Sequence, residues 1–151
     1  MYSEDDFVPV SALQHVLFCE RRAALILLEG LWEDNVSTAE GNLLHERAHQ
    51  AETESRDSLV IVRGLWLRSF RLGLYGKGDI VEFQLLGDDE RNPGVSLAGR
   101  PGLYRPFPVE YKRGRLRSET SFEVQLCAQG LCLEEMLGIE ITSGALYLSL
   151  I

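Results

Sequence analysis

Three ionisable residues interrupt apolar stretches of the chain that have the character of β-strands. Asp79 stands within Tyr-Gly-Lys-Gly-Asp-Ile-Val-Glu-Phe, and Glu110 follows 31 positions later in Pro-Val-Glu-Tyr-Lys-Arg-Gly, which also contains Lys112. Burying a charge in a strand is costly unless that charge is paired or used in chemistry. We therefore expect the fold to bring these three side chains together at one edge of a sheet.

The composition is that of one ordinary globular domain. The chain has 151 residues, of which 45% are hydrophobic and 25% charged, enough for a modest core. Its N-terminus lacks the basic region of a secretory signal, and its longest purely apolar run, residues 23–28, is too short to span a bilayer. We therefore expect a cytoplasmic protein with no membrane partner.

The net charge of −8 argues against non-specific coating of nucleic acid, although it allows a local basic groove. Such a groove is indicated by Lys112, Arg113, Arg115 and Arg117, which place four cations within six residues. The alternative is that this run is a solvated turn.

Hydrophobic periodicity predicts a mixed α/β fold. Helices are expected over residues 11–29, capped by Ser11 and broken near Cys19, over 38–48 and over 120–137; strands are expected over 59–70 and 74–86, around Glu110 and over 139–151. The first two strands form an antiparallel pair, residues 87–105 form a surface loop, and the last helix returns the chain parallel to an earlier strand. The expected architecture is a mixed central sheet flanked by helices.

The three charged residues suit hydrolysis of a phosphodiester. Asp79 and Glu110 supply carboxylates of the kind that hold hard divalent cations. Lys112, two residues after Glu110, falls on the same face of the strand, where it can orient water or neutralise phosphate. Tyr111 points away, with its backbone carbonyl in reach of the metal. The alternative for Glu110 and Lys112 is an exposed salt pair.

Four stretches of the sequence together resemble a known family. They are Phe-Cys-Glu-Arg-Arg at 18–22, Glu-Gly-Asn-Leu-Leu-His at 40–45, Gly-Asp-Ile-Val at 78–81 with Val-Glu-Tyr-Lys at 109–112, and Gln-Leu-Cys-Ala-Gln at 125–129. The combination resembles the RecB-like branch of the PD-(D/E)xK nucleases, and within it the CRISPR-associated exonuclease family Cas-four. The resemblance covers nearly the whole chain and implies a restriction-endonuclease-like core.

The resemblance implies roles for individual residues. His45, Asp79, Glu110 and the Tyr111 carbonyl would bind Mg²⁺ or Mn²⁺, Lys112 would be the catalytic lysine, Gln125 would support the site, and Arg21, Arg22, Arg113, Arg115 and Arg117 would contact DNA. The implied activity is metal-dependent cleavage of DNA, of the single-stranded exonuclease type. Its implied use is to trim and select prespacer ends with single-stranded overhangs during CRISPR spacer acquisition, with the integrase Cas-one, fused or bound, and with Cas-two as partners.

The family also carries a 4Fe-4S cluster, for which this chain has one matching ligand, Cys19. Cys127 and Cys132 lie five residues apart on a predicted helix, so they project about 140° apart and cannot easily bind one cluster. Both are expected to be buried core thiols. The remaining ligands are expected beyond Ile151, in which case residues 1–151 are a nuclease domain truncated before a cysteine group. The chain further departs from the family in having Glu20 in place of proline and Gln129 in place of tyrosine.

Two other classes of function stay open. His45-Glu46-Arg47-Ala48-His49 spells the H-E-x-x-H pattern of zinc peptidases, in which two histidines one turn apart bind zinc. Arg47 is unusual inside that pattern, and a peptidase would leave Asp79, Glu110 and Lys112 unexplained. The third class is a non-catalytic DNA-binding scaffold in which the charged residues are structural ion pairs.

Overall fold

The computed structural model describes residues 1–30, 53–88, 91, 93–114 and 120–150. The predicted helix over 38–48, and with it His45, Glu46 and His49, lies outside the described residues, as do Arg115 and Arg117. The elements in chain order are η1 (Glu4–Asp6), β1 (Val8–Pro9), α1 (Ser11–Phe18), α2 (Glu20–Leu27), β2 (Thr53–Arg56), β3 (Leu59–Ser69), β4 (Leu74–Leu85), β5 (Tyr104–Arg113), α4 (Thr120–Leu137) and β6 (Ala145–Ser149).

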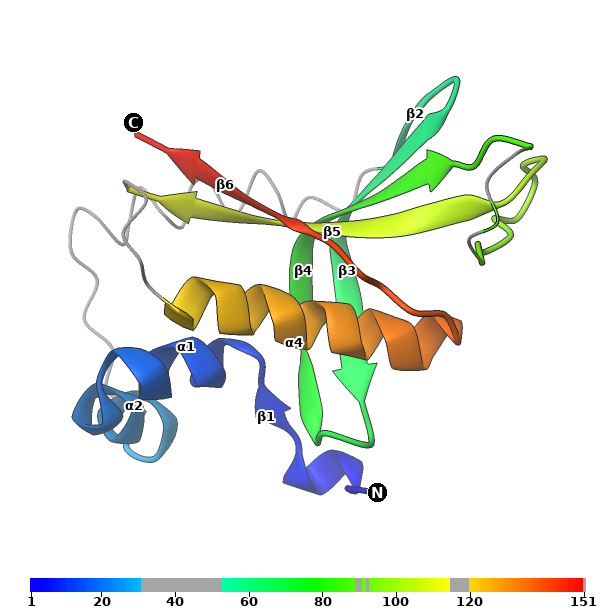
Figure 1. The fold of residues 1–151 in the computed structure, drawn as a ribbon. Helices are drawn as coiled ribbons and strands as arrows, with labels where there is room; N and C mark the ends of the chain where they lie inside the picture. The colour runs from blue at the N-terminus through cyan, green and yellow to red at the C-terminus, as the bar shows by residue number, and fades with distance from the viewer. Residues whose placement is uncertain (31–52, 89–90, 92, 115–119, 151) are drawn as a thin grey trace.

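The strands form one mixed sheet in the order β2, β3, β4, β5, β6, with β1 beside the start of β4 (Figure 1). The successive pairs from β2 to β5 are antiparallel, whereas β1 runs parallel to β4, and β6 runs parallel to β5 after the crossover through α4. A parallel neighbour requires such a crossover, because a short hairpin reverses the chain. The mixed α/β fold predicted from the sequence is confirmed, and its sheet flanked by helices is compatible with a nuclease core.

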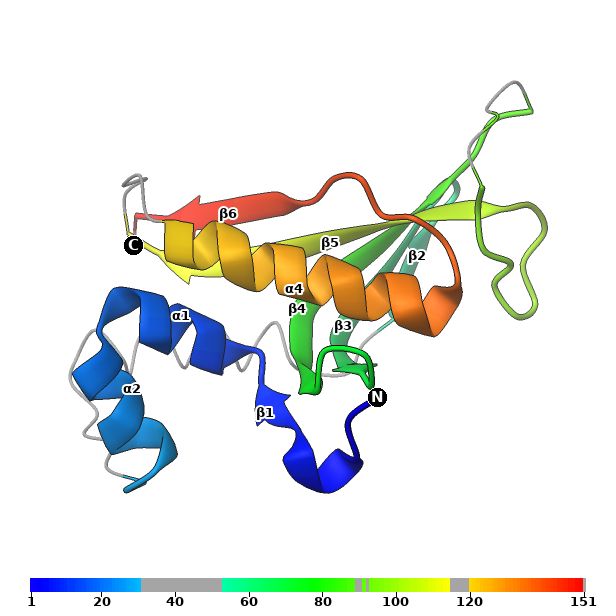
Figure 2. The same cartoon turned by 60° about the horizontal axis from the view of Figure 1, so that its bottom comes forward.

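Helix α4 lies across one face of the sheet, and α1 packs against α4 (Figure 2). The residues that α4 buries recur at helical spacing, among them Gln125, Gln129 and Leu133. Leu133 belongs to the core cluster together with Leu67 of β3 and Val81 of β4. α4 therefore turns two amide side chains toward the sheet alongside its apolar ones.

The predicted ends of the helices agree best with the structure where a glycine follows a long amphipathic segment. α4 has the predicted bounds and is followed by Gly138, whose φ of +68° stops the helix. The first helix breaks at Cys19 as predicted, since Cys19 has extended backbone, but Ser11 is its first helical residue and Val10 precedes it as the cap. Ser11 is therefore not the cap that the sequence suggested.

The strands differ from the prediction in three places. β1 and β2, of two and four residues, were not predicted because such short segments leave no measurable alternation. β6 begins at residue 145 rather than 139, because the preceding segment is a connection in which the Ile141 amide donates to Glu134 Oε1 at 2.9 Å. Apolar residues before β6 pack on the core without joining the sheet.

The cysteines divide between the core and the surface. Cys132 is fully buried, and burial together with Glu135 raises the pKa of its thiol to about 11. Cys127 is exposed, so its expected burial is wrong. The angle of about 140° between the two positions explains this, since one face of a helix cannot bury both. Cys19 is also exposed, at the junction of α1 and α2.

Among the described residues, no helix is both long enough and apolar enough to cross a bilayer.

Candidate active site

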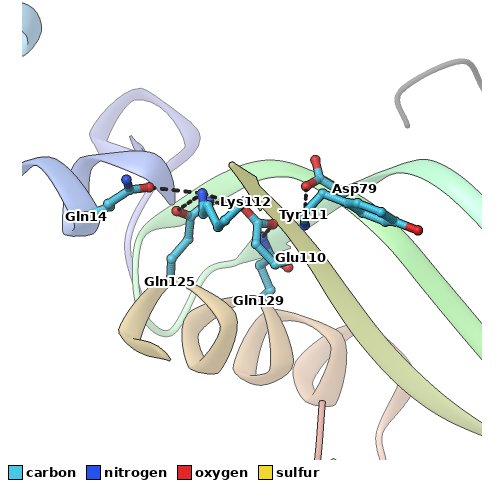
Figure 3. A network of polar contacts seen from close by, with 7 residues as sticks. All are labelled: Gln14, Asp79, Glu110, Tyr111, Lys112, Gln125 and Gln129. Atoms are coloured by element: carbon cyan, nitrogen blue, oxygen red, sulfur yellow. Dashed lines mark hydrogen bonds and ion pairs between the residues drawn. The ribbon is translucent and has the colours of Figure 1, made fainter. Parts of the chain in front are cut away.

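The charged residues singled out in the sequence converge between the middle of the sheet and α4 (Figure 3). Asp79 comes from β4, Glu110 and Lys112 from β5. Ile80 is opposite Val109, so Asp79 and Glu110 occupy the next positions along the two neighbouring strands. We expected these residues to meet at an edge of the sheet. Because β4 and β5 are both interior strands, the residues meet within the sheet instead.

Glu110 is 1% exposed, and both of its carboxylate oxygens accept hydrogen bonds from α4. Gln125 Nε2 donates to Oε1 at 2.9 Å, and Gln129 Nε2 donates to Oε2 at 2.6 Å. Lys112 Nζ adds an ion pair to Oε1 at 2.7 Å. Such charge-assisted hydrogen bonds fix the orientation of a buried carboxylate as well as stabilising it.

Lys112 is held as firmly as the carboxylate that it faces. Its Nζ donates to Gln125 Oε1 at 3.0 Å and to Gln14 Oε1 of α1 at 3.1 Å, besides pairing with Glu110. It also lies 5.3 Å from the centre of the Phe122 ring. Because 10% of the Lys112 side chain is exposed, the residue is largely buried but still accessible to solvent. An exposed salt pair, the alternative open at the sequence level, is excluded for Glu110 and Lys112.

The environment raises the pKa of Glu110 above its ordinary value of 4.5. Burial is the main cause; the charge of Asp79 acts in the same direction, while Lys112 and the Gln129 hydrogen bond act against it. The folded protein therefore binds a proton at Glu110 that the unfolded chain releases, and stability decreases as pH rises from 4.5 through the raised pKa. An ionised Glu110 is thus a strained group, and strained ionisable groups concentrate at functional sites.

Asp79 is 1% exposed, and its Oδ2 accepts a hydrogen bond from the backbone amide of Tyr111 at 2.8 Å. The Tyr111 ring packs on Tyr147 of β6, with ring centres 4.8 Å apart. The aromatic side chain therefore serves the packing of β5 on β6 while its backbone amide holds Asp79. A role of the Tyr111 carbonyl in metal binding stays a prediction.

Two residues of the site were not among those selected from the sequence. Gln129 lies one helical turn after Gln125, on the same face of α4, and this spacing was a signal that could have selected it. Gln14 had no such signal, because its contact with Lys112 spans 98 positions of the chain. Both residues act on the charged pair through side-chain amides.

The donor atoms fit a hard divalent cation. Mg²⁺ in proteins uses one or two carboxylates and keeps several waters, and Asp79 and Glu110 are two buried carboxylates on adjacent strands. Gln129 Oε1 is buried and has no hydrogen-bond partner among the described residues, so a further oxygen is left for a cation or its water. His45, the third expected ligand, lies outside the described residues, and within them no group of three or more His, Cys, Asp or Glu residues is placed to hold a metal.

Further cations lie near the site. The pKa of His15 is lowered by burial and by the charges of Arg22 and Lys112, so both of these cations act on its imidazole. Arg22 also stacks on Phe18 at 5.0 Å. Arg21 and Arg113 are exposed. Contact of these three arginines with DNA stays a prediction.

The two glutamines of α4 provide a matched test of this network. We expect Gln125→Leu to lower the free energy of unfolding by about 2–4 kcal/mol, because it removes one bond to a carboxylate and one to an ammonium. Gln129→Leu removes one such bond and also an unpartnered oxygen, so we expect a smaller loss of about 1–2 kcal/mol. Urea unfolding measures both, and an equal or reversed order would contradict this description of the site.

Two buried carboxylates and a lysine on adjacent strands, supported by glutamines of a crossing helix, are compatible with the nuclease class, PD-(D/E)xK, that the motifs resemble. Comparison with known proteins agrees with that class. Over 151 residues, covering 93% of this chain, the sequence is 34% identical to the CRISPR-associated exonuclease Cas4/endonuclease Cas1 fusion of Geobacter sulfurreducens. The match confirms the resemblance that the motifs gave: the chain is similar to the Cas4 part of that fusion.

The chain spans 23% of that relative, so the match concerns a fraction of the larger protein. No family model matches the sequence.

Proposed function

We propose that this protein is a metal-dependent deoxyribonuclease that trims DNA ends, with prespacer DNA carrying single-stranded overhangs as its substrate in CRISPR spacer acquisition. The observation that carries the proposal is the buried Glu110–Lys112 pair held by Gln125, with Asp79 on the adjacent strand. Similarity to an exonuclease–endonuclease fusion supports the same chemistry.

The residues of the site would have three separate roles: metal binding, charge stabilisation and positioning. Asp79 and Glu110, with His45, would hold Mg²⁺ or Mn²⁺, which when bound supplies charge stabilisation at the phosphate and an activated water. Lys112 would donate to a phosphate oxygen or to the attacking water, because its ammonium is fixed by three oxygen atoms and is not left to solvent. Gln125 positions both charged groups and would not touch the substrate.

The partners in the proposal follow from the relative, which joins a Cas4 exonuclease to a Cas1 endonuclease. We extend to this chain an association with the Cas1 integrase, by fusion or binding, and with Cas2. Cys19 is proposed as one ligand of a 4Fe-4S cluster. Its exposure at the junction of α1 and α2 leaves the thiol accessible for that role.

The proposal is tested with end-labelled single-stranded and overhanging DNA in the presence of Mn²⁺ or Mg²⁺. We expect cleavage that stops with a chelator and that falls by about 10²- to 10⁴-fold in Lys112→Ala, since the lysine stabilises charge that develops in the reaction. Circular dichroism would show that the variant is folded at the assay temperature. Cleavage that survives Lys112→Ala at the parental rate would exclude the mechanism. Metal-independent binding without cleavage would favour a scaffold, and zinc-dependent peptide cleavage lost in Glu46→Ala would favour the peptidase.

A further inference from the structure

The end of the β3–β4 hairpin presents a solvent-facing surface made of two aromatic and two cationic residues. Trp66 and Arg68 of β3 and Tyr75 and Lys77 of β4 are all exposed, Trp66 by 61% and Tyr75 by 41%. The residues between them point the other way: Leu67, in the core cluster with Leu133 of α4, is 2% exposed. These four residues are called the hairpin face below.

The register of the two strands arranges the hairpin face in a fixed pattern. Trp66 is opposite Lys77, and Arg68 is opposite Tyr75. The two aromatic residues therefore lie on one diagonal and the two cations on the other, with Cβ atoms across a diagonal up to about 7–8 Å apart. Lys77 Nζ is 4.8 Å from the centre of the Trp66 ring. The Trp66 ring thus has a positive charge beside it, whereas the Arg68 guanidinium lies over the Phe70 ring, 5.3 Å from its centre.

A cavity of about 600 Å³ adjoins the hairpin face. Its lining includes three of the four residues, Trp66, Arg68 and Tyr75, together with Phe7 and Met136, and the cavity is open to solvent. Volumes of this order are usual for sites that take a small ring-shaped group between apolar walls. Glu4 is the acidic residue of the lining, 3.8 Å from Arg68.

We infer that the hairpin face binds two consecutive unpaired bases of single-stranded DNA. Bases stack on exposed aromatic side chains of a sheet, and cations between the aromatics contact the phosphates, an arrangement that tolerates any sequence. A purely apolar protein partner would have no use for Arg68 and Lys77 between the rings. The inference rests on the proposed nuclease function and adds to it a place where the strand is held.

The hairpin face lies near the proposed site along the chain. Lys77 precedes Asp79 by two residues on β4, so the two Cα atoms lie about 6.6 Å apart along the strand. Asp79 is buried, however, and the proposed site lies between the sheet and α4, whereas the hairpin face is open to solvent. The hairpin face would therefore hold nucleotides beyond the scissile bond, while Asp79, Glu110 and Lys112 would act on the phosphate.

The test uses tryptophan fluorescence in the presence of a chelator, which prevents cleavage. The chain has two tryptophans, so Trp32→Phe leaves Trp66 as the single reporter. We expect oligodeoxythymidylate to quench this fluorescence and Trp66→Ala to weaken binding of the same oligonucleotide by about 5- to 100-fold, measured by polarisation of labelled DNA. Trp66→Phe should retain most of the affinity, and Leu103→Ala, which removes another exposed apolar side chain, should retain all of it. Glu4→Gln should tighten binding, because it releases Arg68 for phosphate.

The outcomes separate this inference from the proposed function. Lys112-dependent cleavage without quenching, and with equal affinity of Trp66→Ala and the parent, would overturn the hairpin face as a binding site and leave the nuclease intact. Quenching and a loss of affinity in Trp66→Ala without cleavage by the parent would leave the binding site and exclude the nuclease. Affinity lost equally in Leu103→Ala would show a general effect of apolar area and would also overturn the inference.

Discussion

Asp79→Asn is expected to remove metal-dependent DNA cleavage while making the protein more stable. The asparagine can still accept the hydrogen bond from the Tyr111 amide, so the local structure should persist. Loss of one carboxylate from the cation site removes several kcal/mol of charge stabilisation, which corresponds to a rate decrease of about 10³-fold. The charge of Asp79 also raises the pKa of Glu110, so its removal relieves repulsion between two buried carboxylates. We expect a gain in stability on the order of 1 kcal/mol.

The measurements are initial rates of cleavage with Mn²⁺ and thermal unfolding without metal, both on folded protein. Glu82→Gln is the matched control: it neutralises another acid on β4, one that accepts a bond from Gln84 at 3.1 Å outside the site. It should leave the cleavage rate unchanged. An Asp79→Asn variant that cleaves as fast as the parent would remove Asp79 from the proposed site. A variant that loses both activity and stability would show that Asp79 is a structural residue.

Lys112→Met is expected to have the largest effect on stability. The substitution leaves Glu110, 1% exposed, without its cation, and breaking a buried pair in this way costs about 3–5 kcal/mol. Lys112 acts to lower the pKa of Glu110, so its loss raises that pKa further. When the pKa of Glu110 is higher in the folded than in the unfolded protein, protonation of Glu110 at low pH stabilises the folded state, and this stabilisation is lost as pH rises. The destabilisation should therefore be small in mildly acidic buffer and grow as pH rises above 4.5.

The double variant Glu110→Leu/Lys112→Met isolates the cause. It loses more contacts than Lys112→Met alone, yet it contains no unpaired buried charge, so we expect it to be the more stable of the two at neutral pH. Urea unfolding at two pH values provides the comparison. Arg113→Met, at the adjacent exposed cation of β5, should change stability by about 0.5 kcal/mol or less. Additive losses in the double variant would show that the pair is not coupled.

The charged centre and the long helix were predictable from the sequence for two different physical reasons. A charge inside an apolar strand is conspicuous because burial must be compensated, and Asp79, Glu110 and Lys112 were recognisable on that ground. α4 was recognisable because its apolar residues recur over five turns and a glycine follows. The position of Gln125 followed from a family resemblance, and the structure shows it bonded to both charged residues.

Other parts of the site could not be predicted, because they depend on contacts distant in the chain. Gln14 meets Lys112 across 98 positions, and a glutamine on an amphipathic helix looks like a solvated residue until the fold places it. The interior position of the site depended on β6, which joins β5 and converts an expected edge into the middle of the sheet. Which of two cysteines on α4 is buried depended on the rotation of that helix against the sheet.

The hydrogen bond from Lys112 to Gln14 joins the N-terminal helices to the charged centre. Gln14 lies on α1, so displacing α1 would break this bond and would also move His15, whose pKa is lowered in part by the charge of Lys112. Thermodynamic linkage makes such a dependence reciprocal: a molecule that binds α1 or α2 and alters the affinity of the centre for DNA must have its own affinity altered by DNA to the same extent. The bond between Gln14 and Lys112 therefore makes the position of α1 and the environment of the charged centre depend on each other.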